Sequence, residues 1–257
     1  MLTIVPFLSF LLFSVAYPLC FWLSARDPIK NKFHHFHIGL PCVTSGLSVL
    51  GLYWLQGPIE IFIPALIWFL LFLILAYQYW NKETVNPIVI SVLCGLGLKV
   101  YVLCHMLLLG FNTYAIFASV LGGLILACAF YAMNLGHWYL NVHGLPLSHL
   151  KKATITLGIL LALRMAWDIG MFTSTQVFLN GEWRSMALFI CKLEGIFLFL
   201  AFFFGTVFPL VSIYFVWGTL QVKSTQSATG ILYVLVSALL IGDIAYKYYL
   251  LKYQLAF

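Results

Sequence analysis

Long apolar runs recur along the whole chain, and their length limits what it can fold into. A helix needs about 20 apolar residues to cross the hydrocarbon core of a bilayer. Runs of roughly that length cover residues 2–24, 38–55, 60–80, 88–110, 114–140, 153–175, 187–217 and 229–251. Backbone groups in lipid must be satisfied within the spanning segment, which favours helices. The sequence therefore predicts an all-α integral membrane protein, a bundle of eight transmembrane helices with short loops.

Composition agrees with a chain that lies almost wholly in the membrane. Of its 257 residues 63% are hydrophobic and 8% are charged, against about 25% charged residues in soluble domains. Because no long polar stretch separates the runs, we expect residues 1–257 to form a single polytopic transmembrane domain. The first run lacks the basic region of a secretory signal, so we expect it to be retained. The six cysteines form no CxxC pair and are expected to be small buried side chains.

The basic residues predict an orientation rather than a nucleic-acid partner, although the formal net charge is +6. Most of them lie in short loops, where Lys and Arg orient a membrane protein. One side of the bundle receives seven and the other three: Arg26, Lys30, Lys32, Lys82, Lys151, Lys152 and Lys223 against Arg184, Lys247 and Lys252. The side with seven is predicted to be cytoplasmic. Eight crossings then place both termini on the outer side of the cell membrane, or of the inner membrane in a bacterium.

The run 153–175 carries Arg164 and Asp168 near its middle. Four residues advance a helix by about 6 Å and return it to nearly the same face, so the two side chains can pair. A charge at the bilayer centre costs about 3 kcal/mol, which makes intramembrane ionisable residues candidates for function. We expect these two residues to line a polar cavity for a ligand, a quinone or a proton path. The alternative is that they only lock two helices together.

Further ionisable residues fall at similar depths. Lys99 and Arg164 lie near mid-membrane, and His105, Asp168, Lys192, Glu194 and Asp243 lie in the outer half. We expect the charges from the three helices carrying Lys99, Arg164 and Lys192 to face one another or a wet cavity. Buried acids and bases beside an imidazole can exchange protons near neutral pH. The residues predicted to do so are Arg164, Asp168, Glu194 and His105. Asp243 is expected to form a local ion pair with Lys247.

The other six histidines gather at the predicted cytoplasmic edge: His34, His35, His37, His137, His143 and His149. Imidazoles from two helices can be the axial ligands of a b-type haem, and His37 with His137 is the pair predicted to bind it. A stripe of small residues at Ala115, Ser119, Gly123 and Ala127 predicts close helix packing. His137 follows Ser119 by five helical turns and is expected to face protein. No metal site is predicted, because the spacings match neither a zinc HExxH helix nor the histidine boxes of membrane di-iron enzymes. The alternative role for the loop histidines is contact with anionic lipid headgroups.

Three functions fit these patterns. Eight aromatic-rich helices without extramembrane domains are similar in architecture to the membrane subunits that exchange electrons with quinol in respiratory complexes. The leading hypothesis is therefore a subunit of an electron-transfer or energy-converting complex. It would bind quinone or haem b and contact other membrane or peripheral subunits. The alternatives are a small proton- or ion-coupled transporter or channel, and a structural subunit whose charges tie helices together. Whether the chain is an enzyme stays open.

Overall fold

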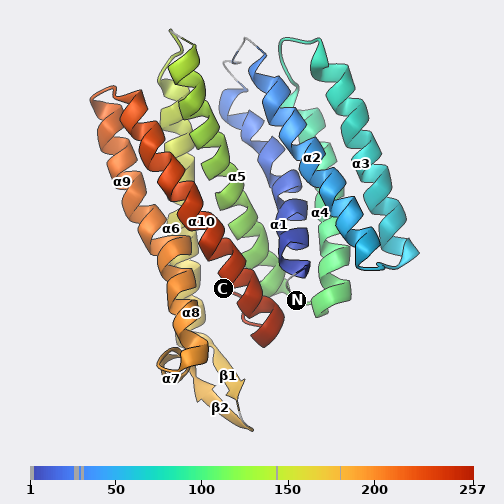
Figure 1. The fold of residues 1–257 in the computed structure, drawn as a ribbon, viewed down its shortest axis with the longest axis vertical. Helices are drawn as coiled ribbons and strands as arrows, with labels where there is room; N and C mark the ends of the chain where they lie inside the picture. The colour runs from blue at the N-terminus through green and yellow to red at the C-terminus, as the bar shows by residue number, and fades with distance from the viewer. Residues whose placement is uncertain (1–2, 26–28, 30–31, 143, 180) are drawn as a thin grey trace. The chain divides into compact units, whose positions relative to one another are not determined.

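Long helices dominate the structure, a computed structural model that describes residues 3–25, 29, 32–142, 144–179 and 181–257. Among these residues, eight helices are long and apolar enough to cross a membrane (Figure 1). This confirms the helical character predicted from the apolar runs, and eight such helices agree with a multi-pass membrane protein. The chain divides into two compact units, Met1–Asn112 and Thr113–Phe257, and each is described by itself.

The first unit contains four of the apolar helices. Its elements are α1 (Ile4–Ala16), which continues as the 3-10 helix η1 (Tyr17–Ser24), α2 (Phe33–Trp54), α3 (Ile59–Trp80) and α4 (Pro87–Leu109). Each helix packs against the next, and α4 also packs against α1, so the four close into a ring. The short connections explain this order, because helices joined by a few residues become antiparallel neighbours.

The second unit contains the other four. Its elements are α5 (Thr113–Asn141), α6 (Ser148–Ser174), strands β1 (Gln176–Leu179) and β2 (Glu182–Ser185), α7 (Met186–Ile190), α8 (Leu193–Phe202), the π-helical turn η2 (Phe203–Val207), α9 (Phe208–Gln221) and α10 (Thr225–Tyr253). Helix α5 packs on α6, α6 on α9, and α10 on α5, α8 and α9. The small-residue stripe of α5 is buried, as predicted: Ala115, Ser119, Gly123 and Ala127.

The seventh span is interrupted where the sequence predicts one run over 187–217. Helix α7 ends at Ile190 and α8 begins at Leu193, so the span consists of α8, η2 and α9. The π-helical turn lies directly before Pro209, which has no N–H and would clash with the carbonyl four residues earlier in a regular helix. A single wide turn therefore accommodates this proline within the span.

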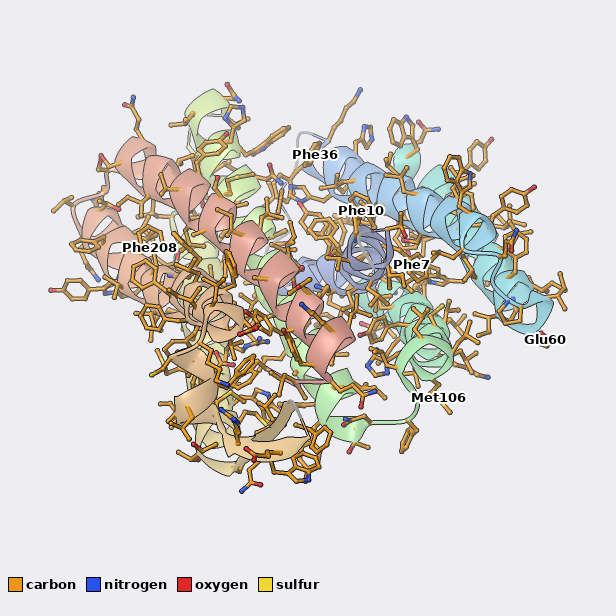
Figure 2. The ribbon with its side chains drawn as sticks, turned by 60° about the horizontal axis from the view of Figure 1, so that its bottom comes forward. Phe7, Phe10, Phe36, Glu60, Met106 and Phe208 are labelled. Atoms are coloured by element: carbon orange, nitrogen blue, oxygen red, sulfur yellow. The ribbon has the colours of Figure 1, made fainter. Side chains whose placement is uncertain are left out.

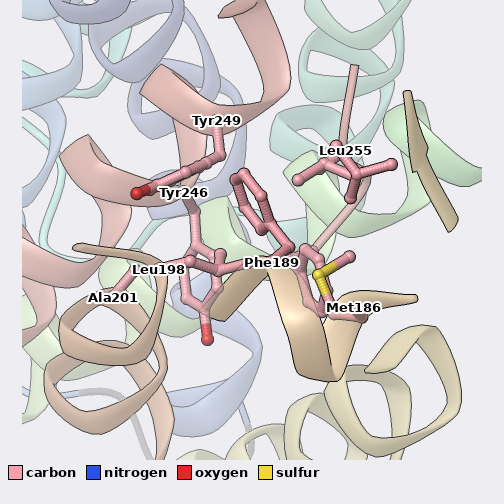
Figure 3. Packing of buried hydrophobic residues seen from close by; sticks show 9 residues of the cluster. Met186, Phe189, Leu198, Ala201, Tyr246, Tyr249 and Leu255 are labelled. Atoms are coloured by element: carbon pink, nitrogen blue, oxygen red, sulfur yellow. The ribbon is translucent and has the colours of Figure 1, made fainter. Parts of the chain in front are cut away.

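A buried apolar cluster closes the end of the second unit that carries the β-hairpin (Figure 3). It joins α7, α8, α10 and the residues after α10: Val177, Met186, Phe189, Leu198, Ala201, Tyr246, Tyr249, Leu255 and Phe257. The strands pair in antiparallel register, with Phe178 opposite Trp183. After α10 the chain folds back, and Trp167 Nε1 donates a hydrogen bond to the Ala256 carbonyl at 2.9 Å. These contacts fix the last turn of α10 against α6.

Apolar side chains also cover the outside of the helices (Figure 2). Phe10, Phe36 and Met106 are labelled examples, and all three are exposed. An exposed apolar surface of this extent is unusual for a soluble monomer. It suits helices that contact a lipid bilayer.

Candidate functional site

Arg164 and Asp168 form an ion pair inside the second unit. Arg164 Nε donates to Asp168 Oδ1 at 3.0 Å, and the two side chains are 3% and 0% exposed. The pairing predicted from their spacing is confirmed. Arg164 lies ten residues before the end of α6, about 15 Å along the helix axis. Two charges are thus held together deep within an apolar helix.

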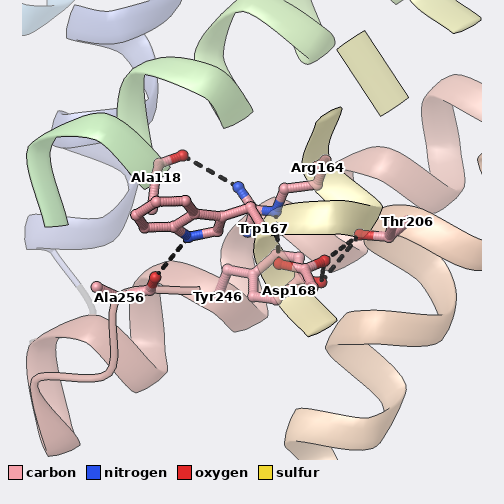
Figure 4. Close-up of polar contacts among 7 residues, drawn as sticks. All are labelled: Ala118, Arg164, Trp167, Asp168, Thr206, Tyr246 and Ala256. Atoms are coloured by element: carbon pink, nitrogen blue, oxygen red, sulfur yellow. Dashed lines mark hydrogen bonds and ion pairs between the residues drawn. The ribbon is translucent and has the colours of Figure 1, made fainter. Parts of the chain in front are cut away.

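The second carboxylate oxygen of Asp168 accepts hydrogen bonds from two hydroxyl groups (Figure 4). Thr206 Oγ1 donates to Oδ2 at 2.6 Å, and Tyr246 Oη donates to the same oxygen at 2.8 Å. Thr206 comes from η2 and Tyr246 from α10, so the carboxylate joins three helices. A buried carboxylate with three donors is well compensated for the loss of water.

Local backbone geometry brings Thr206 and Tyr246 to the carboxylate. Thr206 lies in the π-helical turn, a feature often found at functional sites. Gly205 and Gly242 let η2 and α10 approach closely: a Cβ on Gly205 would lie 3.3 Å from Gly242 Cα and 2.5 Å from the Tyr246 ring. Because Tyr246 follows Gly242 by one helical turn, this contact places its hydroxyl beside Asp168.

The guanidinium of Arg164 makes further contacts on its other side. Nη1 donates to the Ala118 carbonyl of α5 at 3.0 Å, and the group lies over the Tyr246 ring, 4.1 Å from its centroid. Nη2 is buried, and no hydrogen-bond partner for it exists among the residues that the structure describes. An unsatisfied buried donor costs about 1–3 kcal/mol. Arg164 can therefore bind one more acceptor.

A small cavity adjoins Arg164. Its volume is about 30 Å³, and a cavity needs only about 10–15 Å³ to hold one water molecule. The polar part of its lining comes from Ser119, Arg164, Asp243, Tyr246 and Lys247, and Gly122 and Phe257 are among the other lining residues. The cavity has room for water or a small ion beside charged groups.

Asp243 and Lys247 form a second buried ion pair at this cavity. Lys247 Nζ donates to Asp243 Oδ1, which confirms the local pair expected from the sequence. A Cβ on Gly122 would lie 3.4 Å from Arg164 Nη1 and 3.5 Å from Asp243 Oδ1, so both groups adjoin the same glycine. Arg164, Asp243 and Lys247 therefore line one water-sized cavity, and Asp168 is held beside it by its ion pair with Arg164.

Two of the predicted proton-handling residues are not part of this cluster. Glu194 is exposed in the first turn of α8, where its backbone carbonyl accepts a hydrogen bond from the hydroxyl of Tyr249. Lys192 precedes α8 in extended conformation. His105 belongs to the first unit, where it is buried on α4 with its ring 6.0 Å from that of Tyr101.

The histidines of α2 make contacts within the first unit. Helix α2 begins at Phe33, five residues earlier than predicted, and so includes all three of them. His37 Nδ1 lies 2.7 Å from Tyr17 Oη, and its ring is 3.9 Å from that of Phe33. His34 Nε2 lies 3.1 Å from the carbonyl oxygen of Tyr79, and His35 stacks on Trp80. These contacts hold α2 against η1 and α3.

His137 lies in the second unit and is exposed, so the prediction that it faces protein is wrong. It lies near the end of α5, beyond the closely packed stripe, and its Nδ1 is 3.5 Å from Tyr233 Oη. His143 lies outside the described residues, and His149 is buried in α6. The described part of the chain contains no group of three or more His, Cys, Asp or Glu placed to hold a metal ion.

The sequence did not single out Thr206, Tyr246 or the two contacting glycines. The available signal was on α10, where Gly242 and Tyr246 are four residues apart and so are Asp243 and Lys247, which places each pair on one side of the helix. Comparison of the chain with protein-family models, curated proteins and solved structures gave no match.

Proposed function

We propose that the chain is a multi-pass membrane protein that transfers protons through the second unit. The observation that carries this proposal is the cavity lined by Arg164, Asp243 and Lys247, with Asp168 paired to Arg164. Ionisable groups around a space for water supply what proton exchange inside a membrane needs, namely acids, bases and a mobile carrier. The proposal corresponds to the proton-coupled transporter among the functions considered from the sequence.

The geometry supports a role for water in this transfer. Arg164 Nη2 offers a free donor, and a water molecule accepting from it would lie in the space that Asp243 and Lys247 also line. Asp243 can accept an excess proton that reaches it through this water, which leaves the water neutral and weakens the pair with Lys247. Asp168 is held by three donors and serves to keep the guanidinium in place. Asp243 is thus the proton-accepting group and Asp168 the positioning group.

The size of the cavity favours a small species over a quinone. Pockets that bind organic cofactors usually have volumes of about 300–1,000 Å³, whereas this cavity has about 30 Å³. Binding of a quinone ring here would require α5 and α10 to separate. The electron-transfer function, with quinone or with a haem on His37 and His137, stays a prediction from the sequence. The same holds for a complex with other subunits and for the outer location of both termini.

The proposal can be tested by proton flux into liposomes. The purified protein is reconstituted with an internal pH-sensitive dye, and a potassium gradient with valinomycin drives proton entry. We expect flux above that of empty liposomes, and a decrease of about tenfold or more in Asp243→Asn. Glu182→Gln is the matched control, because Glu182 is an exposed acid of the hairpin. Absence of flux in the unmodified protein, or equal flux in Asp243→Asn, would refute the proposal.

A second variant separates loss of flux from loss of folding. Gly122→Ala places a methyl group at ordinary contact distance from Arg164 Nη1 and Asp243 Oδ1, so the fold should persist while the space for water shrinks. We expect reduced flux with an unchanged midpoint of thermal unfolding. Unreduced flux in this variant would show that the cavity is not on the proton path.

A further inference from the structure

Helix α4 carries a positive charge on its exposed face, in the middle of an apolar span. Lys99 lies twelve residues after Pro87 and ten before Leu109, about 18 Å and 15 Å along the helix axis. The side chain is exposed. At this depth snorkelling to the headgroups is out of reach. Within the first unit, Lys99 therefore lies on the outer face of α4.

The residues that the structure describes provide Lys99 with no hydrogen bond and no ion pair; the ion pairs among them are made by other side chains. The opposite face of α4, which includes Val100 and Tyr101, is buried against neighbouring helices. An unpaired charge at the centre of a spanning helix costs about 3 kcal/mol. A carboxylate at the same depth would remove most of this cost.

The surroundings of Lys99 suit a helix as the source of that carboxylate. Its face of α4 carries residues at alternating spacings of four and three, the repeat of a left-handed helix pair: Ile88, Val92, Gly95, Lys99, Val102 and Met106. A Cβ placed on Gly95 would meet nothing within 4 Å. Another backbone can therefore approach closely one turn from the lysine. Met106 marks one end of this face (Figure 2).

We propose that this face of α4 binds a transmembrane helix of a different protein, one that carries an Asp or Glu at the depth of Lys99. A second copy of the chain fits less well, because its own acids are placed elsewhere. Among the described residues, Glu60 and Glu194 lie in first helical turns, Glu83 and Glu182 lie outside the spans, and Asp168 and Asp243 are buried in ion pairs. The charge thus selects a partner with a complementary intramembrane acid.

Photocrosslinking of the full chain in its own membranes tests this proposal. Benzoylphenylalanine at Val92 reports contacts of this face, and the same group at Ile67, an exposed residue of α3, is the control. We expect a crosslinked product when the group is at Val92 and none when it is at Ile67. The protein in this product should be a membrane protein that has a carboxylate inside a spanning segment. Lys99→Glu should lower the yield roughly tenfold, and replacement of the partner carboxylate by Lys should restore it.

Other outcomes would overturn the proposal. These are a product with a second copy of the chain, a product within the same chain, adducts with lipid only, or a yield that Lys99→Glu leaves unchanged. Because Lys99 bonds to no described residue, its substitution should not disturb folding, which thermal unfolding of the purified variant checks. The flux assay uses the purified protein alone, so the two proposals can fail independently.

Discussion

Removing the charge of Asp168 should destabilise the second unit strongly, because Arg164 would keep its charge without its partner. In Asp168→Leu the guanidinium loses its ion pair, and the hydroxyls of Thr206 and Tyr246 lose their acceptor. Loss of one member of a buried pair costs about 3–5 kcal/mol. Interhelical hydrogen bonds in membranes add about 0.6 kcal/mol each. We expect a total loss of about 5 kcal/mol in the free energy of unfolding.

Replacing both charges should be less harmful than replacing one. In the double variant Arg164→Met, Asp168→Leu no unpaired charge remains, and only the hydroxyls and the Ala118 carbonyl lose partners. We expect a loss of about 2 kcal/mol, smaller than that of Asp168→Leu alone. The assay is reversible unfolding by SDS in mixed micelles, followed by tryptophan fluorescence.

The exposed ion pair of the hairpin provides a control, in which the same double-mutant cycle is measured for Arg184 and Glu182. Arg184 and Glu182 are 3.2 Å apart, with side chains 32% and 71% exposed. Their coupling energy should be below about 1 kcal/mol. If the losses caused by Arg164→Met and Asp168→Leu simply add in the double variant, the two residues are not coupled, and the description of the site as a charge pair is wrong.

Three further predictions concern the same unit. Gly242→Ala should cost about 1–3 kcal/mol through overpacking against η2, whereas Gly230→Ala on the same helix meets open space and should be neutral or stabilising in SDS unfolding. Tyr246→Phe keeps the ring below the guanidinium and should cost about 1 kcal/mol, less than Tyr246→Leu in the same assay. Cys191 is exposed, unlike the other five cysteines, so a maleimide should label it first, and an impermeant maleimide should label it from outside if the predicted orientation holds.

The number and position of the apolar helices could be predicted because few backbone conformations are stable in lipid. Apolar runs long enough to cross the bilayer must be helical, and the structure places the helices within a few residues of those runs. The pairing of Arg164 with Asp168, and of Asp243 with Lys247, was equally predictable, since each depends only on the turn of a single helix.

Interactions between helices could not be predicted in this way. Thr206 reaches Asp168 because a π-helical turn rotates it inward, and no helical period reports such a turn. Glu194 and Lys192 looked intramembrane only because the interruption after Ile190 was not foreseen. The exposure of Cys191 has the same origin. Sequence periodicity describes one helix by itself, whereas the site depends on which faces of neighbouring helices pack together.

The π-helical turn Phe203–Val207 also has a consequence for evolution by insertion or deletion of single residues. A turn of this kind contains one residue more than the α-helical turn it replaces, so the helices on either side keep their faces toward their neighbours. Deletion of one residue in the turn would return it to a regular α-helix and withdraw Thr206 from Asp168, while α8 and α9 stayed in register with α10. Insertion or deletion of a single codon would therefore add the hydrogen bond from Thr206 to Asp168, or remove it, without rebuilding the fold.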